Sequence, residues 1–463
     1  MADAASAAPA PGAPLIERVL HPFQRFFATA AAGGLVLLGC TAVALALANS
    51  GWADAYHHFW EVPITVGAPG FGLTLSLHAW VNDALMAVFF FLVGLEIKRE
   101  VLVGELASLR SATLPVAAAL GGMVVPALLY ASVNAGGPGA AGWGVPMATD
   151  IAFALGILAL LGPRVPTGLR IFLAALAIAD DLGAVLVIAL FYTSALDYAA
   201  LGGAGAVLVL LGAFNRAGAR RPLTYAVLGV VLWLFVLKSG VHATIAGVLL
   251  AMTVPARTRI SEEEFIARAE ESLREFRAAD EPGSTVLTNR GHQEALQAME
   301  SACEAAQAPL QRMEHSLHGF VSFLIMPLFA LANAGVPLGG GVATALRSPV
   351  AIGVALGLVL GKPIGIMLAT FVAVRSGAAD LPTATAWRHI HGAGWLAGIG
   401  FTMSLFVAGL AFDDPAVLDT AKIGVLGASL IAGTVGFLLL RNASPAAEEE
   451  AEATAAPAGV ARA

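Results

Sequence analysis

Charged residues are scarce in this sequence, and cysteines are almost absent. Only 12% of the 463 residues are Asp, Glu, Lys or Arg, against roughly 25% in a soluble domain. The two cysteines, Cys40 and Cys303, are too few for a disulfide framework. A large soluble protein and a disulfide-stapled secreted domain are therefore excluded. The 58% of hydrophobic residues points to a membrane protein instead.

Long apolar runs recur along most of the chain. A helix needs roughly 20 mostly apolar residues to cross about 30 Å of hydrocarbon. We expect an all-α polytopic membrane protein with about twelve transmembrane helices, at 26–49, 78–97, 112–133, 144–162, 168–192, 199–214, 223–237, 240–254, 317–333, 350–374, 390–411 and 423–440. The regions 23–254 and 317–441 thus hold spans one to eight and nine to twelve. Residues 1–22 lack the features of a signal peptide, and we predict disordered tails at 1–22 and 442–463.

Basic residues are distributed unevenly over the connections between these spans. With the N-terminus inside, 21 of the 25 Lys and Arg residues fall in connections on the inner side. Three fall outside (Lys238, Arg347 and Lys422), and Lys362 lies within a span. Because cytoplasmic loops are enriched in Lys and Arg, this bias predicts that both termini are cytoplasmic.

Two connections have a pattern of their own. Residues 63–66 and 72–77 alternate around an Ala-Pro-Gly turn, which predicts a small extracytoplasmic β-hairpin within Glu61–Leu77. Its exposed edge is suited to pairing with a second copy, so a homodimer through the hairpin is expected. The connection 255–316 is cytoplasmic and charged. Ser261 there resembles a helix cap before an amphipathic helix, with a break near 282–291 and a second helix; a linker that contacts nothing is the alternative.

Two adjacent aspartates, Asp180 and Asp181, lie deep inside an apolar span. Ionised groups in hydrocarbon are costly and mark functional sites. Because helix neighbours point about 100° apart, at least one carboxylate is expected to meet a cavity. Two close carboxylates in a low dielectric resist joint ionisation, so either a proton or a cation relieves the pair. This choice is the physical basis of exchange; a pair of neutral structural aspartic acids is the alternative.

Two of the predicted spans contain sequences that interrupt a helix. In 144–162, Pro146 removes a backbone donor just before Thr149 and Asp150. In 390–411, four glycines stand within 392–400, the last of them Gly400, and Thr402 follows. An ordinary proline kink and close packing through small residues are the alternatives. Irregular backbone at mid-membrane is tolerated only where it lines a protein cavity, so both breaks indicate a site.

Lys362 lies twelve residues into the span 350–374, about 18 Å along a helix and too deep to reach water easily. It needs a carboxylate partner, for which Asp180 and Asp181 are the candidates, or it must lose its proton. Interrupted spans in both halves favour a transporter built from inverted repeats, here spans three to five and ten to twelve.

Several long motifs resemble the bacterial sodium/proton antiporter family of the NhaA type, for which inverted repeats are an established feature. The resemblance covers roughly 23–254 and 312–441. It is carried by Trp80-Val-Asn-Asp-Ala-Leu-Met-Ala-Val-Phe-Phe, Leu92-Val-Gly-Leu-Glu-Ile-Lys-Arg-Glu100, Ala148-Thr-Asp-Ile-Ala-Phe-Ala-Leu-Gly156, Ala177-Ile-Ala-Asp-Asp-Leu-Gly183, Leu237-Lys-Ser-Gly-Val-His-Ala-Thr244, Pro327-Leu-Phe-Ala, Gly361-Lys-Pro and Gly398-Ile-Gly-Phe-Thr-Met-Ser404.

The resemblance implies roles for individual residues. Asp180 and Asp181, with Thr149, would bind Na⁺ or carry protons. Asp150 would sit with Thr149 where the two interrupted helices cross at mid-membrane, and Lys362 would compensate charge there and pair with Asp180. The candidates for pH sensing are Glu96, Arg99, His242, Glu314, His315 and His318. The family exchanges Na⁺ or Li⁺ for a larger number of protons in the bacterial inner membrane, often as a dimer. The segment 257–311 is longer than expected, and Gln311 stands where some members have a basic residue.

The expected function is therefore electrogenic, pH-regulated exchange of cytoplasmic Na⁺ for external H⁺. The partners are the lipid bilayer and the two ions; no cofactor, nucleic acid or enzymatic activity is expected. A proton- or sodium-coupled transporter of an organic solute is the alternative. An intramembrane aspartyl protease would hold its aspartates on different helices, and a channel gives Lys362 no clear task.

Overall fold

The computed structural model describes residues 32–67, 72–193, 195–280, 285–339 and 342–443. The first half contains α2 (Ala32–Ala48), α3 (Ala53–Glu61), α4 (Leu77–Ala79), α5 (Met86–Val103), α6 (Leu109–Asn134), α7 (Ile151–Leu161), α8 (Thr167–Phe191), α9 (Tyr198–Arg216), α10 (Pro222–Lys238) and α11 (Ile245–Thr253). The predicted tails 1–22 and, beyond Ala443, 442–463 lie outside the described residues, as does the start of the first predicted span.

The second half contains α12 (Glu262–Ala278), α13 (Arg290–Ala306), α14 (Pro309–Phe320), α15 (Met326–Asn333), α16 (Val342–Ala345), α17 (Pro349–Leu356), α18 (Lys362–Arg375), α19 (Trp387–Ala397), α20 (Phe401–Ala411) and α21 (Pro415–Asn442). Several spans also include segments that are not α-helical. Three are π-helical, η1 (Trp80–Leu85), η4 (Val321–Ile325) and η5 (Gly357–Gly361). Two are 3₁₀-helical, η2 (Ala140–Met147) and η3 (Gly162–Arg164).

The described residues include eight helical segments that are long and apolar enough to cross a membrane. Two bent pairs, α2 with α3 and α19 with α20, raise this number to as many as ten. The predicted spans seven and eight correspond to α10, with 17 residues, and α11, with nine. These two helices are shorter than a full span, and they are separated by a turn where Gly240 has a φ of 84°.

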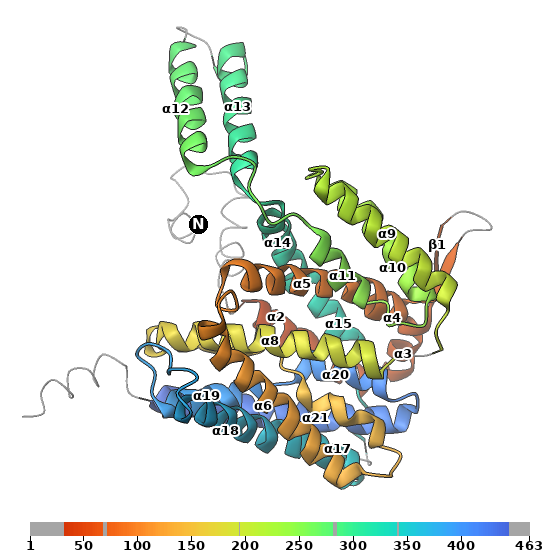
Figure 1. Ribbon diagram of the computed structural model, residues 1–463. Coiled ribbons are helices and arrows are strands. Elements are labelled where there is room, and N and C mark those ends of the chain that lie inside the picture. The colour runs from red at the N-terminus through yellow and green to blue at the C-terminus, as the bar shows by residue number, and fades with distance from the viewer. Residues whose placement is uncertain (1–31, 68–71, 194, 281–284, 340–341, 444–463) are drawn as a thin grey trace, which may run out of the picture.

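The β-hairpin is present as predicted. Its strands are β1 (Pro63–Val66) and β2 (Leu73–Ser76), which pair antiparallel with Pro63 opposite Ser76. The β1 side chains are exposed, and Thr65 and Thr74 join their hydroxyls across the pair at 2.8 Å. The hairpin therefore stands at the edge of the helical body (Figure 1).

Helices α12 and α13 lie side by side and project away from the other helices (Figure 1). Ser261 begins α12 by accepting a hydrogen bond from the backbone N–H of Glu264. Near the other end, the rings of Phe276 and His292 stack with centroids 4.2 Å apart. This arrangement makes the segment a helical hairpin held together mainly by its own contacts.

The other helices of the second half pack on the central spans of the first. Helix α18 packs against α6 where a glycine of each helix, Gly365 and Gly121, faces the other. A Cβ added to Gly121 would lie 2.2 Å from the Gly365 carbonyl oxygen, and one on Gly365 would lie 2.1 Å from that of Gly121. Such contact between small residues lets helix backbones approach closely in a membrane. It sets the depth and rotation of α18, and with them the position of Lys362.

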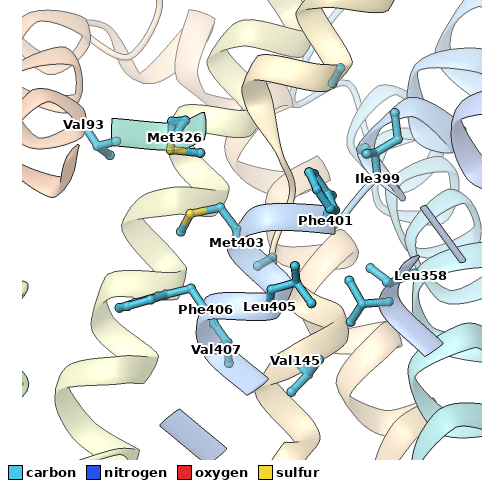
Figure 2. Packing of buried hydrophobic residues seen from close by; sticks show 14 of the residues in the cluster. Val93, Val145, Met326, Leu358, Ile399, Phe401, Met403, Leu405, Phe406 and Val407 are labelled. Carbon is cyan, nitrogen blue, oxygen red and sulfur yellow. The ribbon is translucent and has the colours of Figure 1, made fainter. Parts of the chain in front are cut away.

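Helix α20 is buried over its first eight residues, Phe401–Ala408. Figure 2 shows its side chains, among them Met403, Leu405 and Phe406, in one cluster with Val145 of η2 and Met326 of α15. A helix that is apolar all round is stable only when other helices surround it. The burial of α20 places its first turn, with Thr402, at the centre of the molecule.

Candidate functional site

Asp180 and Asp181 lie in the middle of α8 and are almost completely buried, at 1% and 3% exposure. Their burial follows from the sequence, because almost all of the remaining residues of α8 are apolar. Within the described residues no hydrogen bond to Asp181 is found. Asp180 lies beside the hydroxyl and the backbone N–H of Thr149, although its Oδ1 atom has no well-aligned hydrogen-bond partner. The structure thus holds carboxylate oxygens with few protein donors deep inside the membrane-spanning body.

Lys362 is the ion-pair partner of Asp180. Its Nζ donates to Asp180 Oδ2 over 2.7 Å, and the two side chains are 0% and 1% exposed. Residue reasoning leaves both aspartates as candidate partners, the family resemblance points to Asp180, and the structure shows the pair with Asp180. Lys362 directly follows the π-helical turn η5, which widens the helix just before the lysine. Burial of this cation is tolerated because the pair is close and charge-assisted.

The predicted breaks in both interrupted helices are present and cross each other. Between η2 and α7 the chain is extended at Ala148 and Asp150, near the midpoint of its span. Between α19 and α20 the axis bends by 44°. The Thr149 hydroxyl donates to the Ala397 carbonyl at 2.9 Å, and the Asp150 N–H donates to the Ile399 carbonyl at 2.6 Å. Each break thereby satisfies backbone groups that the other leaves free.

Asp150 connects the starts of two helices. As the cap of α7 it accepts from the Phe153 N–H at 3.1 Å. Its other oxygen accepts from the Thr402 N–H at 3.1 Å and from the Thr402 hydroxyl at 2.5 Å. Gly400 precedes this turn, and a Cβ there would lie 2.1 Å from Ser404 Oγ. Asp150 therefore stabilises the crossing through the positive ends of two helices, and its oxygens are engaged.

The residues predicted to sense pH fall into two places. On α5 and α14, Arg99 forms ion pairs with Glu314 and with Glu100, the latter at 3.0 Å. Glu96 lies one turn earlier on α5, and His315 and His318 follow Glu314 on α14. His242 lies elsewhere: its Nδ1 is 2.9 Å from the Thr244 hydroxyl and its Nε2 is 3.9 Å from Asp83. The structure does not bring His242 into the group around Arg99.

Several polar contacts in the structure were not predicted from the sequence. Asn82 and Asn333 exchange an amide hydrogen bond of 2.8 Å, although 251 residues separate them, and His78 joins them. Glu100 belongs to the group around Arg99, and only its place next to Arg99 hinted at this. Lys422, assigned to an outer connection by sequence, lies within α21 and is only 8% exposed.

Comparison with known proteins shows a match over almost the whole chain. Residues 24–440 match the family model described as Na⁺/H⁺ antiporter 1. A Na⁺/H⁺ antiporter NhaA 2 of Syntrophotalea carbinolica is 53% identical over 92% of this chain and 97% of its own. Proteins named Na⁺/H⁺ antiporter NhaA are 49% identical in Oleidesulfovibrio alaskensis, over 95% of this chain and 97% of their own, and 51% identical in Koribacter versatilis, over 92% of each.

Proposed function

We propose that Na⁺ and H⁺ compete for the carboxylates of Asp180 and Asp181. The chain belongs to the Na⁺/H⁺ antiporter 1 family and exchanges Na⁺ for H⁺ across a membrane. Membership of this family excludes the three alternative functions, which were an organic-solute transporter, a channel and an intramembrane protease. It also identifies the chain as a transporter and not an enzyme.

The observation that carries this proposal is the unequal pairing of the two aspartates. Lys362 neutralises Asp180 through a buried ion pair, whereas Asp181 has no hydrogen bond within the described residues. Asp150, the other buried carboxylate nearby, is held by three donors at the helix crossing. An unpaired buried charge is costly. One proton or one Na⁺ on Asp181 therefore removes the remaining negative charge, and both cannot bind there together.

Thr149 is the third Na⁺ ligand that we propose. Its hydroxyl proton is directed to the Ala397 carbonyl, so the oxygen lone pairs are left to accept a cation. Asp180 lies beside Thr149, and its Oδ1 atom, which has no well-aligned hydrogen-bond partner, offers a further oxygen. Oxygen ligands of this kind suit a hard cation such as Na⁺ or Li⁺.

A cation shared by both carboxylates competes with Lys362 for Asp180. Without its counter-ion, a lysine in this fully buried position loses its proton more readily. Binding of one Na⁺ then releases one proton from Asp181 and one from Lys362, so more protons than sodium ions move in each cycle. The membrane potential, about 2.3 kcal/mol per charge per 100 mV, drives such an exchange. Net inward positive charge expels cytoplasmic Na⁺ while external protons enter.

Access to the site alternates between the two membrane faces in this scheme. Because both aspartates are closed off from the surface, one helix group must move against the other to expose them. The crossing at Asp150 and Thr402 joins the two interrupted helices, so they move together. Alternating access of this kind is the general scheme for transporters with broken helices at mid-membrane.

Regulation, orientation and assembly complete the proposal. The ion-paired group of Arg99 and Glu314, with Glu96, His315 and His318, would sense cytoplasmic pH because its charges link α5 to α14. His242 would respond separately beside Asp83.

The excess of basic residues in inner connections supports cytoplasmic termini in a bacterial inner membrane. The exposed edge of β1 supports a homodimer through Glu61–Leu77.

The test is Na⁺-dependent proton flux in everted vesicles at several pH values, with Na⁺, Li⁺ and K⁺ compared. Asp181→Asn is expected to abolish coupled flux, because an amide carries neither the proton nor the charge. Asp414→Asn serves as the matched control, since Asp414 is an exposed helix cap and asparagine also caps helices. Normal coupled flux in the Asp181 variant would overturn the proposal.

A further inference from the structure

A long apolar groove runs between α18 and α19 on the outer surface of the protein. Its volume is about 690 Å³. One wall is formed by η5 and α18, including Leu360, Ile364 and Phe371, and the other by α19, including Trp387 and Trp395. Ile364 and Phe371 are each more than half exposed. Because both helices belong to membrane-spanning segments, this apolar surface faces the lipid bilayer.

The groove extends from the membrane surface to the middle of the bilayer. At one end, the rings of Phe371 and Trp387 lie 5.8 Å apart, close to the end of α18 and the start of α19. At the other end lie Leu360 and Trp395. Leu360 to Phe371 is eleven helical steps, or roughly 16 Å. Half of a hydrocarbon core is roughly 15 Å, so the groove has the length of one lipid leaflet.

Arginine side chains stand at the surface end of the groove. Arg388 lines it, and Arg375 in the last turn of α18 is exposed on the same side of the membrane. Asp380 in the intervening loop pairs with Arg110 at 3.5 Å. The aromatic ring of Trp387 stands at the same level, where tryptophan is favoured between hydrocarbon and headgroups. Basic pockets between transmembrane helices on the cytoplasmic side suit anionic headgroups.

We propose that this groove binds an anionic phospholipid, with one acyl chain between α18 and α19 and the phosphate at Arg388. A lipid fits better than a protein helix, because the groove is as long as a single leaflet and a basic side chain, Arg388, lines its surface end. On the orientation proposed above, the lipid belongs to the cytoplasmic leaflet. The groove is separate from the ion site, because none of Asp180, Asp181 and Thr149 lines it.

Occupancy of the groove bears on the ion site through α18. Pro363 lines the groove, and its neighbour Lys362 is the residue that pairs with Asp180 inside the protein. An acyl chain therefore packs against the outer face of the turn whose inner face holds the buried lysine. This consequence for transport rests on the proposed function, whereas the lipid site itself does not.

Lipid binding is tested by native mass spectrometry on the purified full-length protein. Phosphatidylglycerol and phosphatidylcholine with identical acyl chains are the two probes. The wild-type protein is expected to hold one phosphatidylglycerol more tightly than phosphatidylcholine. Arg388→Gln is expected to weaken phosphatidylglycerol binding about fivefold, from ~1 kcal/mol per arginine near a membrane surface. Arg441→Gln is the control, because Arg441 is an exposed basic residue in the last turn of α21.

A second variant tests the groove independently of its charge. Ile364→Trp places a large ring in the groove and is expected to displace both lipids, whereas Leu430→Trp, on a 72% exposed position of α21, is expected to displace neither. Equal binding of the two lipids, or unchanged binding in both groove variants, would refute the site. A change in the monomer–dimer ratio of the Ile364 variant without lipid loss would assign the groove to a second copy and also refute it.

Antiport by the same preparations, reconstituted in vesicles, separates this inference from the proposed function. A protein that binds phosphatidylglycerol in the groove but shows normal flux after Asp181→Asn would retain the lipid site and lose the ion mechanism. The reverse result would retain the mechanism and remove the lipid site.

Discussion

The buried ion pair of Lys362 and Asp180 allows a quantitative test of charge compensation. Lys362→Met keeps an unbranched side chain of similar length but removes the charge. Asp180 would then be an unpaired carboxylate at 1% exposure. Removing one partner of a buried pair costs about 3–5 kcal/mol. We expect a loss of this size in the free energy of unfolding at neutral pH, measured by denaturation in mixed micelles.

The double variant Lys362→Met/Asp180→Asn is the decisive comparison. It removes both charges, and well-packed neutral replacements of a buried pair are often close to neutral in stability. We therefore expect it to recover most of the stability that either single change loses, with a coupling energy of about 3 kcal/mol. The loss in Lys362→Met alone is expected to shrink as pH falls, because Asp180 can then take up a proton. Protonation leaves it neutral.

An exposed pair provides the control for this cycle. Arg110 and Asp380 lie 3.5 Å apart with side chains 89% and 86% exposed, and such pairs contribute at most about 1 kcal/mol. Neutralising either residue should change stability little. The reasoning is refuted if the two changes at Lys362 and Asp180 are simply additive. It is also refuted if Lys362→Met unfolds like the wild-type protein and transports with the same net charge per cycle.

Three further predictions follow from the contacts around the site. Thr402→Val removes the hydroxyl that donates to the aspartate at the helix crossing, so we expect a loss of about 1–3 kcal/mol and slower antiport, with the exposed Thr434→Val as the control. Gly357→Ala would place a Cβ 2.5 Å from Pro146 and should reduce thermal stability, whereas Gly427→Ala meets open space and should not. Arg99→Gln breaks ion pairs to two glutamates; its pH profile of antiport in vesicles should shift, and an unchanged profile would remove the group around Arg99 from pH sensing.

Local features were predictable because their causes lie within a few residues. The hairpin follows from two short alternating runs around a turn, and the cap at Ser261 follows from its own hydroxyl and the next turn of backbone. Pro146 and the glycines before Phe401 weaken a continuous helix locally, so both breaks could be expected near these residues from the sequence.

Other features depend on partners that are distant in the sequence. Hydropathy alone does not reveal that Gly240 separates a 17-residue helix from one of nine residues. The amide pair of Asn82 and Asn333 is uncharged and joins two spans, so composition gives no sign of it. The π-helical turn before Lys362 likewise shows no local sequence pattern that we could identify.

The sequence by itself determined that this chain spans a membrane, where its helices break and which buried residues carry charge, because each of these follows from the cost of placing particular groups in hydrocarbon. Tertiary structure decided that Asp150 is occupied by Thr402 and that His242 lies apart from Arg99. These choices depend on the rotation and depth at which separate helices pack. Contacts such as that between Gly121 and Gly365 set this geometry only once the chain has folded.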